Sequence, residues 1–316
     1  MNILHNIARS KLIVGVAACV CPLIGQNSPL GDALGRARDY ARRNMLLEAE
    51  DQARKAVAAQ PESADAHYFL GYLLFRRAKP RESLAEYTEG AKYRQPEAGD
   101  LRIVGADYFL LKDYSDADRL FTRATEYDPS NVLGWYYLGR TKYNESRLEE
   151  AVQAFEKCLT LSPRNVRAED NLGLSLQGLG RHQDALAAFQ NAVAWQTDSP
   201  EKDPWPYLDL GSFLLEINRP SDAISPLLQA TELAPDSPKA REQLGKAYLS
   251  VKDFAKAQRE LEQAVRLEPD RAPAHYILGQ LYQRLGQAGK AKQEFDRYAV
   301  LNAAKQKISP QDSRPE

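Results

Sequence analysis

Cysteine is scarce in this chain of 316 residues. Two of its three cysteines, Cys19 and Cys21, lie in an apolar segment near the N-terminus, which leaves Cys158 alone in the body of the protein. Because a single thiol cannot form an intramolecular disulfide, the body must be stable through packing alone. Cys158 has no histidine beside it in the sequence, so we interpret it as a buried, unreactive thiol.

An excess of charge of one sign is also lacking. The chain carries 42 basic and 43 acidic side chains, which gives a formal net charge of -1. Nucleic-acid binding is driven largely by basic side chains that neutralise phosphates. We therefore predict that this protein has no nucleic-acid partner.

The residue patterns of metal and nucleotide sites are incomplete. None of the four histidines has a second histidine, a cysteine or a carboxylate at the helical spacing of a zinc site. Gly173 and Gly178 have the spacing of a phosphate-binding loop but lack the lysine and hydroxyl residue that must follow. Asp113, Asp116 and Asp118 lack the glycine and final glutamate of a calcium loop, so we expect them to cap a helix. We predict no cofactor, no metal and no catalytic residues.

A long apolar run occurs in one place, at the N-terminus. Arg9 and Lys11 precede an uncharged apolar run over residues 12–25, and Gln26 begins a polar stretch. This order is typical of a secretory signal peptide. The run is shorter than the roughly 20 residues that a membrane-spanning helix requires. We predict that residues 1–25 form a bacterial-type signal peptide and that the protein is periplasmic or secreted.

A second interpretation of the same segment is lipidation. Val16, Ala17, Ala18 and Cys19 resemble the lipobox of a bacterial lipoprotein, in which a lipid on Cys19 tethers the mature protein to a membrane. An uncleaved apolar anchor and a chance arrangement also stay open. We expect membrane association only if Cys19 is lipidated.

The rest of the chain repeats itself every 34 residues, with one exception. The same slot of each repeat holds a Leu-Gly or Val-Gly pair whose glycines are Gly71, Gly105, Gly139, Gly173, Gly211, Gly245 and Gly279. Twelve residues later comes a small residue, and four further on a bulky one: Tyr87, Phe121, Phe155, Phe189, Leu227, Leu261 and Phe295. Repeats close at a proline, which ends a helix. His67 and His275 stand three residues before a Leu-Gly pair, so we interpret them as packing residues.

This pattern resembles the tetratricopeptide repeat, whose 34 positions run aromatic, Leu-Gly, Tyr, Ala, Phe, Ala, Pro. The resemblance implies an all-α fold, a right-handed α-solenoid, or superhelix, of antiparallel helix-turn-helix repeats. Stability in such an array comes from the stacking of neighbours, with the bulky residue filling the gap to the next repeat. We expect an array over residues 26–305, with repeats that begin near 30, 64, 98, 132, 166, 204, 238 and 272, and a disordered tail over 306–316.

Three departures from the period stand out. The first repeat has Arg36-Ala37 in place of Leu-Gly, as expected for a terminal capping repeat. Four residues are inserted within 197–204, and two prolines there predict a loop that acts as a flexible joint. The last hairpin lacks a covering helix around Leu281 and Phe295, which would favour weak self-association; a plain short cap is the alternative.

In the family that the chain resembles, ligands lie in the concave groove lined by the first helix of each hairpin. The same register places aromatic and arginine side chains there, and such side chains often dominate binding energy. The resemblance implies a groove site made of Tyr68, Tyr72, Phe75, Arg76, Arg102, Phe109, Tyr136, Arg140, Tyr143, Asn144, Arg167 and Asn171. An extended acidic or aromatic peptide would suit it. Packing of several of these tyrosines between neighbouring repeats is the alternative interpretation.

We therefore predict a non-catalytic scaffold or adaptor that binds a peptide or protein segment, with a role in envelope or secretion assembly. The role is inferred from the N-terminal segment and the family, and not from the repeats. A self-associating structural array is one alternative function. The other is an accessory subunit that presents substrate to an enzyme.

Overall fold

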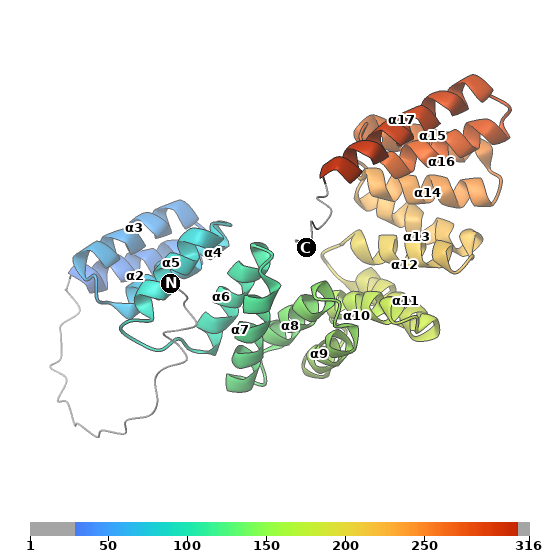
Figure 1. Cartoon of the computed structure of the whole chain (residues 1–316). Coiled ribbons are helices and arrows are strands. Elements are labelled where there is room, and N and C mark those ends of the chain that lie inside the picture. Colours follow the sequence, from blue (N-terminus) through green and yellow to red (C-terminus); the bar gives the residue numbers. More distant parts are fainter. Residues whose placement is uncertain (1–28, 309–316) are drawn as a thin grey trace, which may run out of the picture. The chain divides into compact units, whose positions relative to one another are not determined.

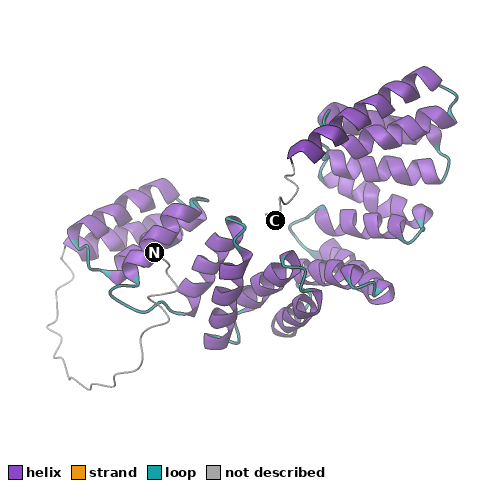
Figure 2. Cartoon of the chain, viewed as in Figure 1, coloured by secondary structure: helices purple, strands orange, loops and turns teal. Residues whose placement is uncertain are grey.

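The computed structural model describes residues 29–308, and this part of the chain has sixteen α-helices joined by turns and loops, with no strand (Figure 2). The predicted signal peptide, with Cys19, lies outside the described residues, as do residues 309–316 of the predicted tail. The all-α prediction is confirmed, and the helices form the tandem hairpins of an α-solenoid.

The helices pair into eight consecutive hairpins. The first helices are α2 (Pro29–Arg42), α4 (Ala64–Arg76), α6 (Ala98–Leu110), α8 (Val132–Asn144), α10 (Val166–Gly178), α12 (Trp205–Glu216), α14 (Pro238–Ser250) and α16 (Ala272–Arg284). The second helices are α3 (Leu46–Ala59), α5 (Pro80–Gly90), α7 (Tyr114–Tyr127), α9 (Leu148–Leu161), α11 (His182–Asp198), α13 (Pro220–Leu233), α15 (Phe254–Leu267) and α17 (Ala288–Ile308). The first helices begin within one residue of the starts that the period predicts.

The chain divides into two compact units, residues 1–161 and 162–316. The first unit contains the hairpins from α2 to α9, and the second contains those from α10 to α17 (Figure 1). Within each unit, a hairpin packs against the next one along the chain. Because a single hairpin cannot bury its apolar face alone, this stacking supplies the core.

Short-range signals set the ends of the helices. The side chains of Ser63, Asn131, Asn165 and Ser237 each accept a hydrogen bond from the backbone N–H three residues later, which caps a first helix. The turn inside each hairpin contains one residue with positive φ at the same register. These residues are Asn44, Ala78, Lys112, Ser146, Gly180, Asn218, Lys252 and Gly286. The turn therefore demands a left-handed residue even where the sequence does not supply glycine.

The glycine of each Leu-Gly pair faces the bulky residue of its own hairpin. A Cβ added to Gly139 would lie 2.7 Å from the Phe155 ring, which is fully buried. The bulky residues also reach the next hairpin, as predicted: the Phe121 ring stacks on Tyr137 with a centroid distance of 5.5 Å. One aromatic side chain thus holds two interfaces together, and this explains why the glycine recurs.

The glycine requirement predicts a clear effect on stability. A Cβ at Gly211 would lie 2.4 Å from Cγ of the buried Leu227, so Gly211→Ala forces the two helices apart. Overpacking of this kind costs about 1–3 kcal/mol, which we expect as a lower urea midpoint measured by circular dichroism. Gly289→Ala is the matched control, because no atom lies within 4 Å of its added Cβ. Equal midpoints for both variants would contradict the packing argument.

The insert near residue 200 is more ordered than a bare loop. Helix α11 continues to Asp198, since the sequence has no helix breaker before Pro200, so only residues 199–204 form the loop. The Gln196 side chain donates to the Glu201 carbonyl at 2.8 Å, and the Lys202 ammonium donates to the Thr197 carbonyl at 2.6 Å. The insert lies inside the second unit, whereas the boundary between the units follows Leu161.

The last helix of the array extends a few residues beyond 305. Helix α17 continues to Ile308, because the next breaker in the sequence is Pro310. Leu281 is fully buried, while Phe295 lies half-buried against Tyr276 with a centroid distance of 5.9 Å. The end hairpin thus covers part of the apolar face that was expected to be open.

The polar residues singled out in the sequence have structural roles. His67 Nε2 lies 2.8 Å from the Pro61 carbonyl oxygen, and its Nδ1 lies 2.7 Å from the Glu86 carboxylate. His275 repeats this arrangement in the last hairpin. The packing interpretation of both histidines is confirmed, and the Asp113 side chain caps α7 as predicted. Cys158 is buried, and burial raises the pKa of its thiol to about 11, so the thiol is neutral at pH 7.

Candidate functional site

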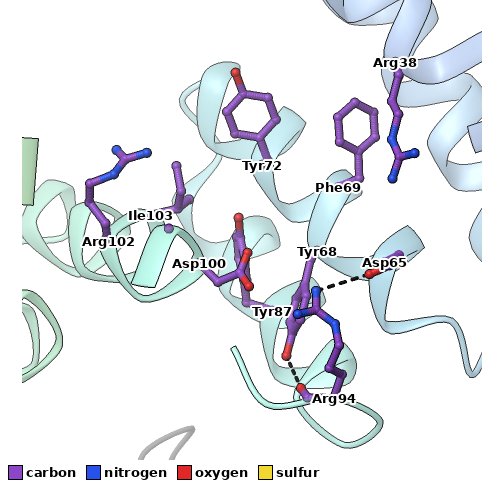
Figure 3. Close-up of a pocket in the computed structure, with 11 residues that line it drawn as sticks. Arg38, Asp65, Tyr68, Phe69, Tyr72, Tyr87, Arg94, Asp100, Arg102 and Ile103 are labelled. Carbon is purple, nitrogen blue, oxygen red and sulfur yellow. Dashed lines mark hydrogen bonds and ion pairs between the residues drawn. The ribbon is translucent and has the colours of Figure 1, made fainter. Parts of the chain in front are cut away.

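The first compact unit has a cavity of about 320 Å³ between its first helices. Helices α2, α4 and α6 supply most of its wall, and α5 and the loop after it supply the remainder. The lining residues are Arg38, Asp65, Tyr68, Phe69, Tyr72, Tyr87, Arg94, Gly99, Asp100, Arg102 and Ile103 (Figure 3). The groove register therefore contains a true hollow in this unit.

A second cavity of about 400 Å³ adjoins the first. Both cavities are lined by Arg38, Phe69 and Tyr72, and the second extends along α4 to Arg76. We call the combined hollow the Tyr72 trough, with Arg38, Phe69, Tyr72, Arg76 and Arg102 along it. Figure 3 shows the Arg38 and Arg102 guanidinium groups on opposite sides of the Tyr72 ring.

The arginines of the trough have no acidic partner. Among residues 29–308, no carboxylate lies within ion-pair distance of the guanidinium groups of Arg38, Arg76 or Arg102. Arg38 lies over the Phe69 ring at 5.8 Å, and Arg76 lies 5.9 Å from the Tyr72 ring and donates to the Asn44 amide oxygen at 2.7 Å. The positive charge of these groups thus stays available to a ligand.

The floor of the cavity is, by contrast, held by internal interactions. Tyr68 is buried and its hydroxyl donates to the Arg94 carbonyl, while the Arg94 guanidinium pairs with Asp65 at 3.2 Å (Figure 3). Burial, and then the charge of Asp100, raise the pKa of Tyr68 to about 12, so its phenol is neutral. Burial likewise raises the pKa of Tyr87. The floor is therefore an aromatic surface that also holds the Arg94–Asp65 ion pair and the Asp100 carboxyl, beneath a rim that carries arginines.

The residues predicted from the sequence fall into three sets. Tyr72, Arg76 and Arg102 line the trough, while Tyr68 contributes to its floor and is mainly a packing residue. Phe75 is half-buried and packs on two core clusters, one shared by the second and third hairpins and one shared by the third and fourth. Of the two predicted tyrosines on α4, Tyr72 is therefore placed for binding and Tyr68 mainly for packing.

A second set gathers around Arg140 on α8. Its guanidinium carbon lies 4.7 Å from the Phe109 ring centroid and 5.8 Å from that of Tyr136. Tyr143 is half-buried on the same helix, and the exposed Asn144 donates through its side chain to the Arg140 carbonyl at 2.7 Å. The first unit therefore presents a second aromatic surface that carries an arginine.

The third set lies in the second compact unit and takes no part in the trough. Arg167 is exposed, with its Nε 3.8 Å from the Asp203 carboxylate. The Asn171 side chain donates to the Arg167 carbonyl at 2.7 Å. The predicted groove residues thus belong to two separate units.

Sequence reasoning missed several trough residues, chiefly Arg38 and Phe69. Arg38 stands one period before Tyr72, so the register alone could have identified it. It was overlooked because the first repeat lacks the Leu-Gly pair that marks the register. Phe69 stands beside Leu70 and reads as an ordinary core residue, so no sequence signal distinguishes it.

Residues 29–308 contain neither a metal-binding group of side chains nor a helix that could span a membrane. No group of three or more histidine, cysteine or acidic side chains there is arranged to hold a metal ion. No helix in this range is both long and apolar enough to cross a membrane.

Comparison with known proteins agrees with the helical hairpins. A tetratricopeptide repeat family model matches residues 34–98, 105–166 and 171–238, and a second model of the same description matches residues 248–303. The chain is similar to the peroxisomal targeting signal receptor of Kluyveromyces lactis, with 32% identity over 91 residues. That match covers 29% of this chain and 16% of the receptor, so it spans about a sixth of the relative's length.

Solved structures share the fold at low sequence identity. A tetratricopeptide repeat protein from Parabacteroides merdae has a TM-score of 0.62 and 16% identity, covering 82% of this chain and 100% of that one. A chain of the APC/C hetero-tetramer Cut9–Hcn1 has a TM-score of 0.60 and 19% identity, covering 88% of this chain and 54% of that one. At these identities the likeness concerns the fold alone.

Proposed function

Since this chain belongs to the tetratricopeptide repeat family, whose members are generally non-catalytic interaction scaffolds, we propose that it binds an extended segment of a partner protein in the Tyr72 trough. The partner segment carries acidic side chains and at least one aromatic side chain. The protein acts as an adaptor and performs no chemistry on the segment.

The observation that carries this proposal is the set of arginines without acidic partners around Tyr72. Arg38, Arg76 and Arg102 come from three successive first helices and flank an aromatic surface. A guanidinium binds a carboxylate through two parallel hydrogen bonds, which gives affinity and orientation together. Tyr72 and Phe69 offer ring faces on which a ligand side chain can pack.

The electrostatics of the trough favour this class of ligand. A carboxylate placed at Arg38 or Arg102 gains attraction from a cation that has no ion-pair partner among residues 29–308, and this attraction must outweigh repulsion from Asp65 and Asp100, which line the same cavity. The rigid floor lowers the cost of binding, since few side chains must be ordered on association. A strongly basic segment would meet repulsion at the same place.

The cellular setting is part of the proposal. The charged, apolar and polar order of the first 28 residues supports export, and an exported adaptor of this kind would serve envelope or secretion assembly in a bacterial cell. We propose that the protein is periplasmic or secreted. A lipid on Cys19 would instead make it a membrane-anchored lipoprotein.

A peptide selection tests the proposed ligand class. The full chain is used to select binders from a random 12-residue display library, and acidic and aromatic residues should be enriched. Arg38→Gln with Arg102→Gln should abolish the acidic enrichment. Tyr72→Ala should weaken the best selected peptide about tenfold or more in fluorescence anisotropy, as for a central interface residue.

Arg81→Gln is the matched control, because Arg81 is an exposed arginine on α5 that lies outside the trough. It should select the same peptides with unchanged affinity. Selected peptides that bind the parent, the trough variants and the control equally well would place binding elsewhere and refute the proposal.

A further inference from the structure

A second surface of the first compact unit lies outside the trough. It consists of Arg140 on α8 and the rings of Phe109 and Tyr136, and we call it the Arg140 surface. No carboxylate among residues 29–308 lies within ion-pair distance of the Arg140 guanidinium, whereas Arg147, on the next helical hairpin turn, pairs with Asp118 at 2.8 Å. Arg140 therefore shares with the arginines of the trough the lack of an acidic partner.

Arg140 also occupies the same position in its repeat as two residues of the trough. The residues at this position in the first four repeats are spaced by 34 and lie on α2, α4, α6 and α8: Arg38, Tyr72, Ala106 and Arg140. Equivalent positions of stacked repeats follow one another along the array. Helix α6 contacts both α4 and α8. The series is therefore continuous from the trough to the Arg140 surface.

Helix α6 connects the two sites directly. Arg102 lines the trough, and Phe109, seven residues later, has its ring centroid 4.7 Å from the Arg140 guanidinium carbon. Seven residues are two helical turns, so Arg102 and Phe109 lie on one face of α6, about 10 Å apart along its axis. Ala106 lies between them on that face and is 2% exposed. Helix α6 thus places no long side chain between Arg102 and Arg140.

Half-buried aromatic rings continue from the trough to the Arg140 surface. Tyr72 and Phe75 pack on the core cluster shared by the second and third hairpins, and Phe75 and Phe109 pack on the cluster shared by the third and fourth. Phe75 therefore belongs to both. A ligand that follows this path can pack on aromatic side chains along its whole length, and such side chains often dominate binding energy.

We propose that the partner segment extends from the Tyr72 trough to the Arg140 surface and carries two acidic side chains, one bound by Arg102 and one by Arg140. This inference rests on the proposed function and specifies its ligand. The path along α6 separates the two guanidinium groups by about 10–15 Å. An extended segment rises about 3.3 Å per residue and directs every second side chain to the same side. Acidic residues four positions apart therefore fit both arginines.

The aromatic rings beside Arg140 prepare it for this contact. A guanidinium that lies over an aromatic face keeps its N–H groups available to bind a carboxylate through two parallel hydrogen bonds. The Arg140 guanidinium carbon lies 4.7 Å from the Phe109 ring centroid and 5.8 Å from that of Tyr136. These contacts restrict the side chain before a ligand arrives, so less conformational entropy is lost on binding.

A comparison of peptide selections tests the second anchor. Selection of 12-residue peptides on the full chain should enrich pairs of acidic residues four positions apart. Selection on Arg140→Gln should lose the pair and still enrich one acidic and one aromatic residue, because the trough is intact. Arg123→Gln is the matched control, since Arg123 lies on α7, outside the trough, with its guanidinium carbon 5.2 Å from the Tyr127 ring centroid. This control should select the same pairs as the parent.

A double-mutant cycle with the best selected 12-residue peptide distinguishes a direct contact from a structural effect. Replacing the second acidic residue of the peptide by its amide should weaken binding to the parent about tenfold in fluorescence anisotropy. Arg140→Gln should weaken the unchanged peptide by the same factor, with parent-like circular dichroism. The two changes together should weaken binding no more than either alone, because both remove the same contact.

The outcomes separate this inference from the proposed function. Additive losses in the cycle, or an Arg140→Gln selection that keeps the acidic pair, would overturn the second anchor and leave the Tyr72 trough as proposed. If the parent enriches no acidic residue, and the variant with Arg38→Gln and Arg102→Gln selects the same peptides as the parent, both proposals are wrong.

Discussion

Phe155→Ala should lower the stability of the first compact unit by about 3–5 kcal/mol, the usual cost of removing a fully buried phenylalanine. The Phe155 ring is completely buried and lies on Gly139 of its own hairpin, with Tyr136 6.2 Å away between ring centroids. Its loss leaves a cavity that the neighbouring helices cannot easily fill, because the hairpins on either side fix their spacing.

The measurement is urea unfolding followed by circular dichroism. Leu133→Ala is the control, since Leu133 is a large apolar residue on α8 that is 50% exposed, and it should change stability by no more than about 0.5 kcal/mol. A cost below about 1 kcal/mol for Phe155→Ala would mean that the ring does not hold the hairpin together.

Asp107→Asn should stabilise the protein at pH 8 and have little effect at pH 4. Asp107 lies on α6, is completely buried, and neither of its carboxyl oxygens accepts a hydrogen bond from the described residues. The nearby Ser83 hydroxyl donates to the Gly71 carbonyl instead. Burial, opposed in part by Ser83, raises the pKa of Asp107 to about 7 from an ordinary value of 3.8.

The direction of the pH effect follows from proton binding. Between about pH 4 and pH 7 the folded state binds more protons at this residue than the unfolded state, so stability falls as pH rises through that window. A difference of about three pKa units corresponds to roughly 4 kcal/mol lost above pH 7. The amide still lacks partners, so we expect Asn to recover only about 1–3 kcal/mol of this at pH 8.

Thermal unfolding of parent and variant from pH 4 to pH 8 measures this effect. The two curves should separate progressively above pH 4, with the variant more stable. Glu149→Gln, an exposed carboxyl on α9, is the control and should run parallel to the parent. Parallel curves for Asp107→Asn as well would show that the pKa of Asp107 is the same in the folded and unfolded states, and would contradict the prediction.

The unusual position of Asp107 could have been recognised from the sequence once the register of the repeats is known. The equivalent residues two places after each repeat glycine are Leu73, Thr141, Ser175, Phe213, Ala247 and Leu281, and all are completely buried. A carboxylate among such residues is visibly anomalous in the printed sequence. The register does not show whether a hydrogen-bond donor contacts the Asp107 carboxyl group, because such a donor would come from another helix.

For the candidate site, too, the sequence predicts some residues and the tertiary structure decides the others. Tyr72 and Arg102 were predicted because they share a register with groove residues, and Arg38 could have been. That Tyr68 packs on the floor while Tyr72 lines the trough depends on how closely α4, α5 and α6 approach one another.

The sequence by itself determined the all-α class and the hairpin boundaries, because both depend on residues within one 34-residue period. Local signals such as caps and prolines act over a few residues, so they can be read directly. Only the tertiary structure decided that the chain forms two compact units, that Arg38, Arg76 and Arg102 lack acidic partners, and that Asp107 lacks a donor. These properties depend on side chains brought together from different hairpins, and no spacing along the chain encodes their distances.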